Sequence, residues 1–172
     1  MPENVILETS FSSPGPVIST NTDYIQQIFT NLVTNACEAV GKDRATMYLS
    51  IKTVSPSEIP TKNRFPVNWQ SQDNAYACLE VVDTGCGIED KDIEKLFDPF
   101  YSTKFTGRGM GLAVVLGIVK THKGVLTVES EPGRGSTFRV FFPLAKEALQ
   151  QPQKDASSDD SLISTVCPIK FE

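Results

Sequence analysis

Apolar residues recur at helical spacing in two segments of this 172-residue chain. Between residues 22 and 40 they return every three to four positions, as on one face of an α-helix, and Gly41 follows as a C-terminal stop. The members of this stripe are Ile25, Ile28, Phe29, Leu32, Ala36 and Ala39. A second apolar helix is predicted over residues 112–121, and a short helix over residues 89–96 is interrupted by Pro99.

Alternating or continuously apolar runs predict the strands. Four of them cover residues 46–54, 75–82, 125–129 and 137–142. Residues 5–7 and 16–18 are short apolar segments separated by the turn-forming sequence SSPG, which predicts a β-hairpin. Residues 55–74 are polar and contain prolines, which predicts a surface loop.

The order of these elements predicts an α+β fold, a two-layer α/β sandwich with one mixed β-sheet and its helices packed on one face. At 40% hydrophobic residues the chain is long enough for a single domain with a substantial core, which we place at residues 1–145. Residues 146–172 are rich in Gln, Ser and Asp and are predicted to be a disordered tail or linker. The apolar residues 166–169 inside this tail have no interpretation from the sequence.

Composition narrows the classes of function. A net charge of −5 gives no basic surface for nucleic acid. No apolar run is long enough to span a bilayer and the N-terminus lacks the features of a signal peptide, so a cytoplasmic domain without membrane contact is expected. The four cysteines have no Cys-x-x-Cys spacing and the chain has one histidine, which argues against a zinc site and against a disulfide framework.

Candidate chemistry begins at Asp83, which follows an apolar strand and precedes Gly85 and Gly87. A carboxylate accepts hydrogen bonds and donates none, so it suits an exocyclic amine such as that of adenine. The two glycines would let a flat ring approach the backbone closely. Most such motifs, taken alone, are ordinary turns in which the aspartate bonds its own backbone, and that interpretation is favoured for Asp83 by this motif alone.

Three polar residues of the first long helix, Asn31, Asn35 and Glu38, project from one face beside the apolar stripe. Asn35 offers an amide oxygen that could bind Mg²⁺, and Glu38 offers a carboxylate. The alternative is a solvated polar flank of the helix.

A cation and several glycines precede the second apolar helix. Lys104 and residues 107–111 could bind a phosphate chain through a positive charge, backbone N–H groups and the helix dipole. The spacing Gly-x-Gly-x-Gly matches neither the dinucleotide fingerprint nor the Walker pattern, and we reject a Rossmann assignment. A surface loop remains compatible with the same residues.

Together, five motifs in this order resemble those of one family, the catalytic ATP-binding domain of sensor histidine kinases. This family belongs to the superfamily of gyrase, heat-shock chaperone, histidine kinase and MutL, and it has the Bergerat-type fold. The resemblance covers residues 1–145. The motifs are NLVTNACEA at residues 31–39, DTGCGI at 83–88, LFDPFYSTK at 96–104, GRGMGL at 107–112 and GRGSTF at 133–138.

The resemblance implies a role for particular residues at the adenine end of the site. Asp83 would accept a hydrogen bond from the adenine amine, with Gly85 and Gly87 shaping that wall. Ser136 or Thr137 would form a hydrogen bond near the adenine and Asp83.

At the phosphate end, the resemblance implies that Asn35 holds Mg²⁺ and that Asn31 contributes to the pocket. Lys104 and the backbone of Gly109 and Gly111 would cover the phosphates. The remaining implied residues are Arg108 and Leu112 at the nucleotide, and Phe97 and Phe100 as anchors that pack onto the domain. Many members of the family have a basic residue where this chain has Glu38.

By the same resemblance, the chain would be the catalytic part of a protein-histidine kinase in a two-component system. It would bind ATP and Mg²⁺ and donate the γ-phosphoryl group to a histidine on a separate dimerisation domain of the parent kinase. A response regulator would follow through the parent protein. His122 lacks the sequence context of that phospho-acceptor and is interpreted as a residue at a helix end.

Two other functions stay open from the sequence. One is an ATP-hydrolysing conformational switch of the gyrase, MutL or chaperone type. Those relatives resemble one another in having a glutamate at the position that Asn31 occupies in this chain. An amide cannot act as a base at neutral pH. The other is a non-catalytic module that senses nucleotide.

Overall fold

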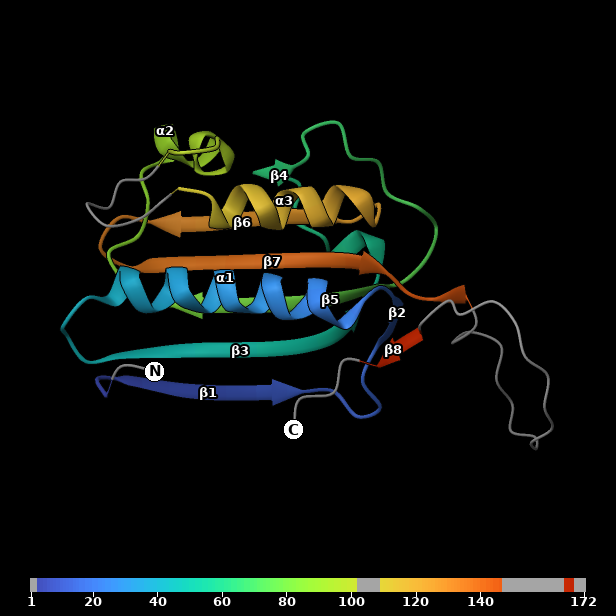
Figure 1. Cartoon of the computed structure of the whole chain (residues 1–172), viewed down its shortest axis with the longest axis horizontal. Helices are drawn as coiled ribbons and strands as arrows, with labels where there is room; N and C mark the ends of the chain where they lie inside the picture. The colour runs from blue at the N-terminus through green and yellow to red at the C-terminus, as the bar shows by residue number, and fades with distance from the viewer. Residues whose placement is uncertain (1–2, 102–108, 147–165, 169–172) are drawn as a thin grey trace.

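Six strands form one mixed sheet in the order β1-β3-β5-β7-β6-β4, and α1 and α3 lie on one of its faces (Figure 1). This arrangement confirms the predicted two-layer α+β fold. The computed structural model of the chain describes residues 3–101, 109–146 and 166–168. In chain order the elements are β1 (Val5–Phe11), β2 (Val17–Ser19), α1 (Thr22–Val40), β3 (Ala45–Val54), η1 (Pro56–Glu58), β4 (Arg64–Phe65), β5 (Tyr76–Asp83), α2 (Asp90–Ile93), η2 (Glu94–Phe97), α3 (Gly111–Thr121), β6 (Val125–Glu131), β7 (Gly135–Pro143) and β8 (Val166–Pro168).

Helix α1 has the predicted bounds. The Asn21 side chain accepts a hydrogen bond from the backbone N–H of Asp23 at 2.9 Å, which satisfies one of the unpaired donors at the helix start. Gly41 ends the helix with φ of +67°, a backbone conformation that residues other than glycine rarely adopt. Between these ends the apolar stripe is buried against the sheet, with Ile28 and Leu32 almost inaccessible.

The principal core lies between the sheet and the helices. Alternate residues of the central strands, such as Met47 and Leu49 on β3, point toward α1 and α3 and are buried there. Val115 and Val119 on α3 close the same core from the helix side. This arrangement brings the end of β5, the helix α1 and the start of α3 together.

The opposite face of the sheet carries a second, smaller apolar cluster. It is formed by Val54, Ile59, Tyr76, Cys78, Val125 and Phe141, with Trp69 packed against it. Residues 55–74 cover this cluster, so the prediction of a polar surface loop is wrong for part of the segment. Ile59 is buried because it covers apolar strand residues of this cluster that would otherwise face water, whereas Phe65 is buried in the principal core.

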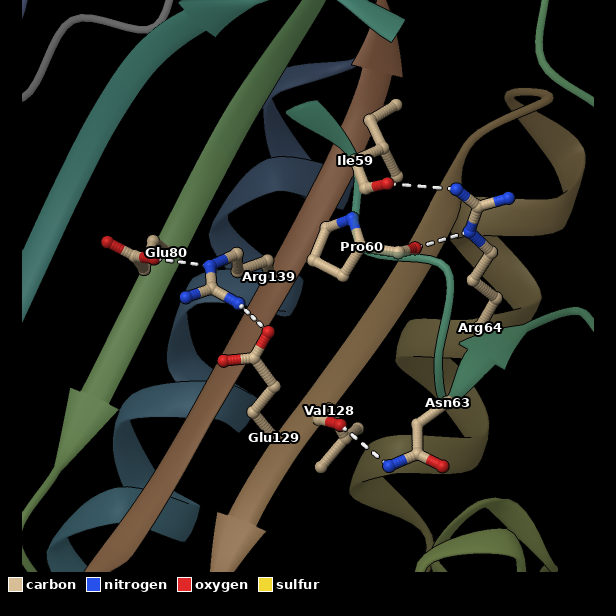
Figure 2. Close-up of polar contacts among 8 residues, drawn as sticks. All are labelled: Ile59, Pro60, Asn63, Arg64, Glu80, Val128, Glu129 and Arg139. Carbon is tan, nitrogen blue, oxygen red and sulfur yellow. Dashed lines mark hydrogen bonds and ion pairs between the residues drawn. The ribbon is translucent and has the colours of Figure 1, made fainter. Parts of the chain in front are cut away.

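Polar contacts fasten this covering segment and the neighbouring strands (Figure 2). The Asn63 side chain donates to the carbonyl of Val128 at 3.1 Å, and Arg64 donates to the carbonyls of Ile59 and Pro60. Beside them, the Arg139 side chain reaches across the sheet to two carboxylates. Arg139 forms an ion pair with Glu80 on β5 and another, at 2.8 Å, with Glu129 on β6.

The predicted hairpin of the first two strands is wrong. β1 pairs with β3 in parallel, from Val5 opposite Ala45 to Phe11 opposite Ile51. β2 instead pairs antiparallel with β8, in a separate two-stranded sheet. Proline has no N–H donor, so Pro14 and Pro16 weaken any ladder between the two segments. By this pairing with β2, residues 166–168 form a strand within a segment that the sequence predicts to be a disordered tail or linker.

Candidate functional site

A cavity of about 260 Å³ opens between α1, the end of β5, the start of α3 and β7. Nine of the residues that the sequence singles out line it. These are Asn31, Asn35, Glu38, Asp83, Gly87, Gly109, Gly111, Leu112 and Ser136. Residues far apart in the chain thus converge on one hollow.

Asp83 is the last residue of β5 and is only 3% exposed. Its carboxylate Oδ1 accepts a hydrogen bond from the backbone N–H of Gly85 at 2.8 Å. The turn interpretation and the site interpretation are therefore compatible, because the local bond orients the carboxylate at the cavity wall. On the neighbouring strand, Ser136 lies directly opposite Asp83 in the ladder.

The glycines after Asp83 serve close packing. A Cβ on Gly85 would lie 2.6 Å from the backbone carbon of Ala39, and the N–H of Cys86 donates to the Ala39 carbonyl at 3.1 Å. Gly85 thus joins the loop to the last turn of α1 and is absent from the cavity lining. Gly87 has φ of +67° and does line the cavity, and a Cβ there would lie 2.1 Å from the Glu131 carbonyl oxygen.

Helix α1 supplies the polar wall, which consists of Asn31, Thr34, Asn35 and Glu38. Amide and carboxylate oxygens are ligands that Mg²⁺ accepts, and Mg²⁺ in nucleotide sites commonly takes one or two protein ligands together with phosphate oxygens. The donor chemistry at Asn35 and Glu38 fits such an ion. In the described part of the chain, no group of three or more His, Cys, Asp or Glu side chains is placed to hold a metal ion.

The start of α3 approaches α1 closely. A Cβ on Gly111 would lie 2.9 Å from Oδ1 of Asn31, so glycine is what lets the two helices meet at this point. Just before it, Gly109 has φ of +62°, and its carbonyl accepts a hydrogen bond from the N–H of Phe100 at 2.9 Å. This bond joins the two ends of the segment 101–108.

Several lining residues are missing from the sequence prediction. They are Thr34, Ala39, Cys86, Ile88, Leu96, Tyr101, Met110 and Phe138. Many of them are apolar and give the cavity surfaces suited to a flat ring. Phe138 follows Ser136 by two positions on β7, so the two-residue period of a strand could have identified it.

Tyr101 stands at the cavity with its hydroxyl bonded to Asp92 of α2, which also forms an ion pair with Lys95 at 3.3 Å. Partial burial and the hydrogen bond to this carboxylate raise the pKa of the Tyr101 hydroxyl. Tyr101 therefore stays a neutral hydrogen-bond donor throughout the neutral range.

Other predicted residues lie elsewhere. Thr137 is not among the lining residues, because alternation along β7 places it on the opposite face from Ser136. Phe97 is buried as predicted and its ring lies 4.4 Å from that of Phe65, whereas Phe100 is 79% exposed and does not pack onto the domain. Lys104 and Arg108 lie outside the described residues.

His122 caps α3 and is occupied by structural contacts. One ring nitrogen, Nδ1, lies 2.8 Å from the carbonyl of Ile118, and the other, Nε2, lies 2.9 Å from the hydroxyl of Thr20. The ring edges also contact Tyr24 and Phe142. These contacts agree with the interpretation of His122 as a residue at a helix end.

The fold is thus a mixed sheet covered on one face by two helices, with a cavity at one end that is lined by a buried carboxylate and several glycines. Residues 20–146 match the family of histidine kinase-, DNA gyrase B- and HSP90-like ATPases, and the chain belongs to this family. In the described residues, no helix combines the length and the apolar character needed to cross a membrane.

The chain is similar to one part of several sensor kinases. It is 32% identical over 146 residues to sporulation kinase C of Bacillus subtilis (strain 168), a match covering 84% of this chain and 29% of that protein. It is 33% identical over 162 residues to the sensory histidine kinase/phosphatase NtrB of Rhizobium leguminosarum bv. phaseoli, covering 90% of this chain and 39% of that protein. The chain thus corresponds to the ATPase domain of such kinases and spans well under half of these relatives' length.

Solved structures show the same fold. The catalytic domain of histidine kinase ThkA has a TM-score of 0.62 at 23% identity, over 82% of this chain and 80% of that chain. Full-length ShkA in complex with AMPPNP has a TM-score of 0.62 at 24% identity, over 82% of this chain and 26% of that chain.

Proposed function

We propose that this domain binds Mg-ATP in the cavity and donates the γ-phosphoryl group to a histidine on the dimerisation domain of its parent kinase. A response regulator would receive the signal through that parent protein, and we place the domain's action in the cytoplasm. The observation that carries the proposal is the convergence of Asp83 from β5 and Asn35 from α1 on one cavity.

The proposed roles rest on side-chain positions for Asp83, Asn35 and Ser136, and on the sequence motifs alone for Lys104 and Arg108. Asp83, held by the Gly85 N–H, accepts from the adenine amine, and Ser136 lies beside it. Asn35 lines the same cavity from α1, and its amide oxygen is a suitable ligand for Mg²⁺. Lys104, Arg108 and the backbone at Gly109 and Gly111 are proposed to contact the phosphates.

Phosphoryl transfer depends mainly on positioning and on neutralising the charge of the transferred group. Mg²⁺, when bound, would supply part of that neutralisation at the phosphates. The chain's own contribution is to orient the nucleotide and to keep water from the γ-phosphate. Since a neutral imidazole is a competent nucleophile, the domain needs no strong base, in agreement with an amide at Asn31.

The deciding experiment mixes the purified domain with the histidine-bearing dimerisation domain of its parent and labelled Mg-ATP. We expect acid-labile phosphohistidine on the partner, and no transfer by the D83N variant. Rapid release of free phosphate without the partner would instead indicate a hydrolysing switch. Tight Mg-ATP binding with neither transfer nor hydrolysis would indicate a nucleotide-sensing module.

A further inference from the structure

A hydroxyl behind the cavity wall, that of Ser130 on β6, contacts three groups at once. The backbone N–H of Ile88 donates to its Oγ at 2.8 Å. The Ser130 hydroxyl donates to the carbonyl of Gly135 at 3.0 Å, and its Oγ lies 2.9 Å from the hydroxyl oxygen of Ser136. Ser130 itself does not line the cavity, whereas Ser136 does.

The direction of the third contact follows from counting hydrogens. A serine hydroxyl has one hydrogen to donate and two lone pairs that accept. The Ile88 N–H can only donate and the Gly135 carbonyl can only accept, so they use one lone pair and the single hydrogen of Ser130. All three bonds form together only when Ser136 donates its own hydrogen to the remaining lone pair of Ser130.

This arrangement sets what Ser136 can offer to a ligand. Its side chain is 5% exposed and lies opposite Asp83 in the β5–β7 ladder, at the same end of the cavity. Once its hydrogen is committed to Ser130, Ser136 presents only lone pairs to the cavity. The Asp83 carboxylate is also an acceptor, so two acceptors stand side by side.

We propose that Ser130 is a positioning residue that fixes the hydroxyl direction of Ser136 and thereby makes the cavity select 6-aminopurine over 6-oxopurine nucleotides. The inference rests on the proposed binding of ATP in this cavity. An exocyclic amine donates to the pair of acceptors, directly or through a water. A 6-oxo group brings a third acceptor to the same place, where it finds no donor.

Replacing Ser130 with alanine removes the acceptor for the Ser136 hydrogen. The Ser136 hydroxyl can then rotate and donate into the cavity, where a 6-oxo group would accept it. The ratio of ITP to ATP dissociation constants, measured by calorimetry with Mg²⁺, should therefore fall by about fivefold or more in S130A, the scale of one unsatisfied buried hydrogen bond. S130T keeps the hydroxyl and should restore the ratio of the unmodified domain.

Ser50 provides a matched control, because its hydroxyl donates to Glu80 at 3.2 Å on the opposite face of the sheet. S50A should leave the nucleotide ratio unchanged. If Ser130 has a purely structural role, S130A should weaken the binding of ATP and of ITP equally. That result would overturn the inference about Ser130 but would not contradict the proposal that the domain binds ATP. Failure of the unmodified domain to bind Mg-ATP would overturn the proposed function together with it.

A second variant tests the same point without altering Ser130. S136A removes one of the two acceptors and should also lower the preference for ATP over ITP. In the double variant S130A/S136A, the loss of Ser130 should have no further effect on the ratio, because the hydroxyl that it orients is absent. An unchanged ratio in S136A would refute the assigned polarity.

Discussion

A Cβ on Gly135 would lie 1.9 Å from the carbonyl oxygen of Asp83, so these two residues meet backbone to backbone across the β5–β7 pair. Gly135 also has φ of +104°, a conformation that L-residues with side chains rarely adopt. The third glycine motif therefore sets how closely the strand that carries Ser136 approaches the strand that ends in Asp83.

The first prediction concerns this contact. G135A should destabilise the domain by about 2–4 kcal/mol, because it combines backbone strain with a steric clash. It should also weaken ATP binding by displacing Asp83. Urea unfolding and calorimetry measure the two effects.

Two other glycines serve as controls for G135A. Gly133 has φ of +77° but open space around its Cβ position, so G133A should show the strain without the clash. Gly117 is an exposed position inside α3 with no atom within 4 Å of its Cβ position, and G117A should stabilise the helix by about 0.5–1 kcal/mol. Equal costs for G135A and G133A would contradict the clash.

The second prediction concerns the carboxylate. D83N keeps an oxygen that can accept from the Gly85 N–H, so the turn and the fold should persist. The amide N–H₂ then faces the adenine amine, and Mg-ATP affinity should fall by about 10- to 100-fold, the scale of a lost bond to a charged group. Calorimetry measures the affinity and circular dichroism verifies the fold. An unchanged affinity would remove Asp83 from the adenine site.

The third prediction is a pH dependence on the opposite face of the sheet. Burial alone would raise the pKa of Glu80, but the hydrogen bond and the charge of Arg139 dominate with Lys52 and Ser50, and the pKa is lowered below its ordinary value of 4.5. A carboxyl whose pKa is lowered by folding stabilises the protein above the unfolded-state pKa. That contribution is lost as the pH falls through the folded-state pKa.

The E80Q variant tests this dependence. Its free energy of unfolding should lie below that of the unmodified domain at pH 7, and the difference should shrink steadily as the pH falls below the ordinary carboxyl value. Urea unfolding at several pH values measures the difference. A gap that stays constant down to acidic pH would show that the charge of Glu80 contributes nothing.

The fourth prediction separates two cysteines. Cys78 is fully buried in the second apolar cluster, and desolvation raises the pKa of its thiol to about 12. Cys86 is exposed and lines the cavity. A maleimide should therefore modify Cys86 and spare Cys78 in the folded domain, and Mg-ATP should slow the reaction of Cys86. Peptide mass spectrometry after timed labelling shows which residue reacts.

Sequence reasoning succeeded where the signal is local. The helical period over residues 22–40 and the glycine that follows predicted both ends of α1, because these signals lie within one continuous segment of the chain. About half of the residues that line the cavity, Asp83 and Asn35 among them, were also predicted from motifs. The choice between Ser136 and Thr137 was decidable in principle, since Ser136 shares the inward face of its strand with Phe138.

The misses are long-range. Nothing local tells β1 that its partner is β3 rather than β2, because strand pairing depends on contacts across more than thirty residues. Ile59, Phe65 and Trp69 show no period, so their segment resembles a loop, even though Ile59 and Trp69 pack in the second apolar cluster and Phe65 in the principal core. The role inferred for Ser130 depends on three partners from separate segments, which no spacing rule reveals.

The parallel pairing of β1 with β3 has a mechanical consequence. Helix α1 lies within the connection between two strands that are neighbours in the sheet: its C-terminal end leads into β3, and its N-terminal end leads back to β1 through β2. A shift of the helix along the sheet would therefore pull on β3 and on the segment that contains β2. The wall that carries Asn31 and Asn35 is thus tethered at both ends, and we expect a change in the width of the cavity to come from the side that faces it.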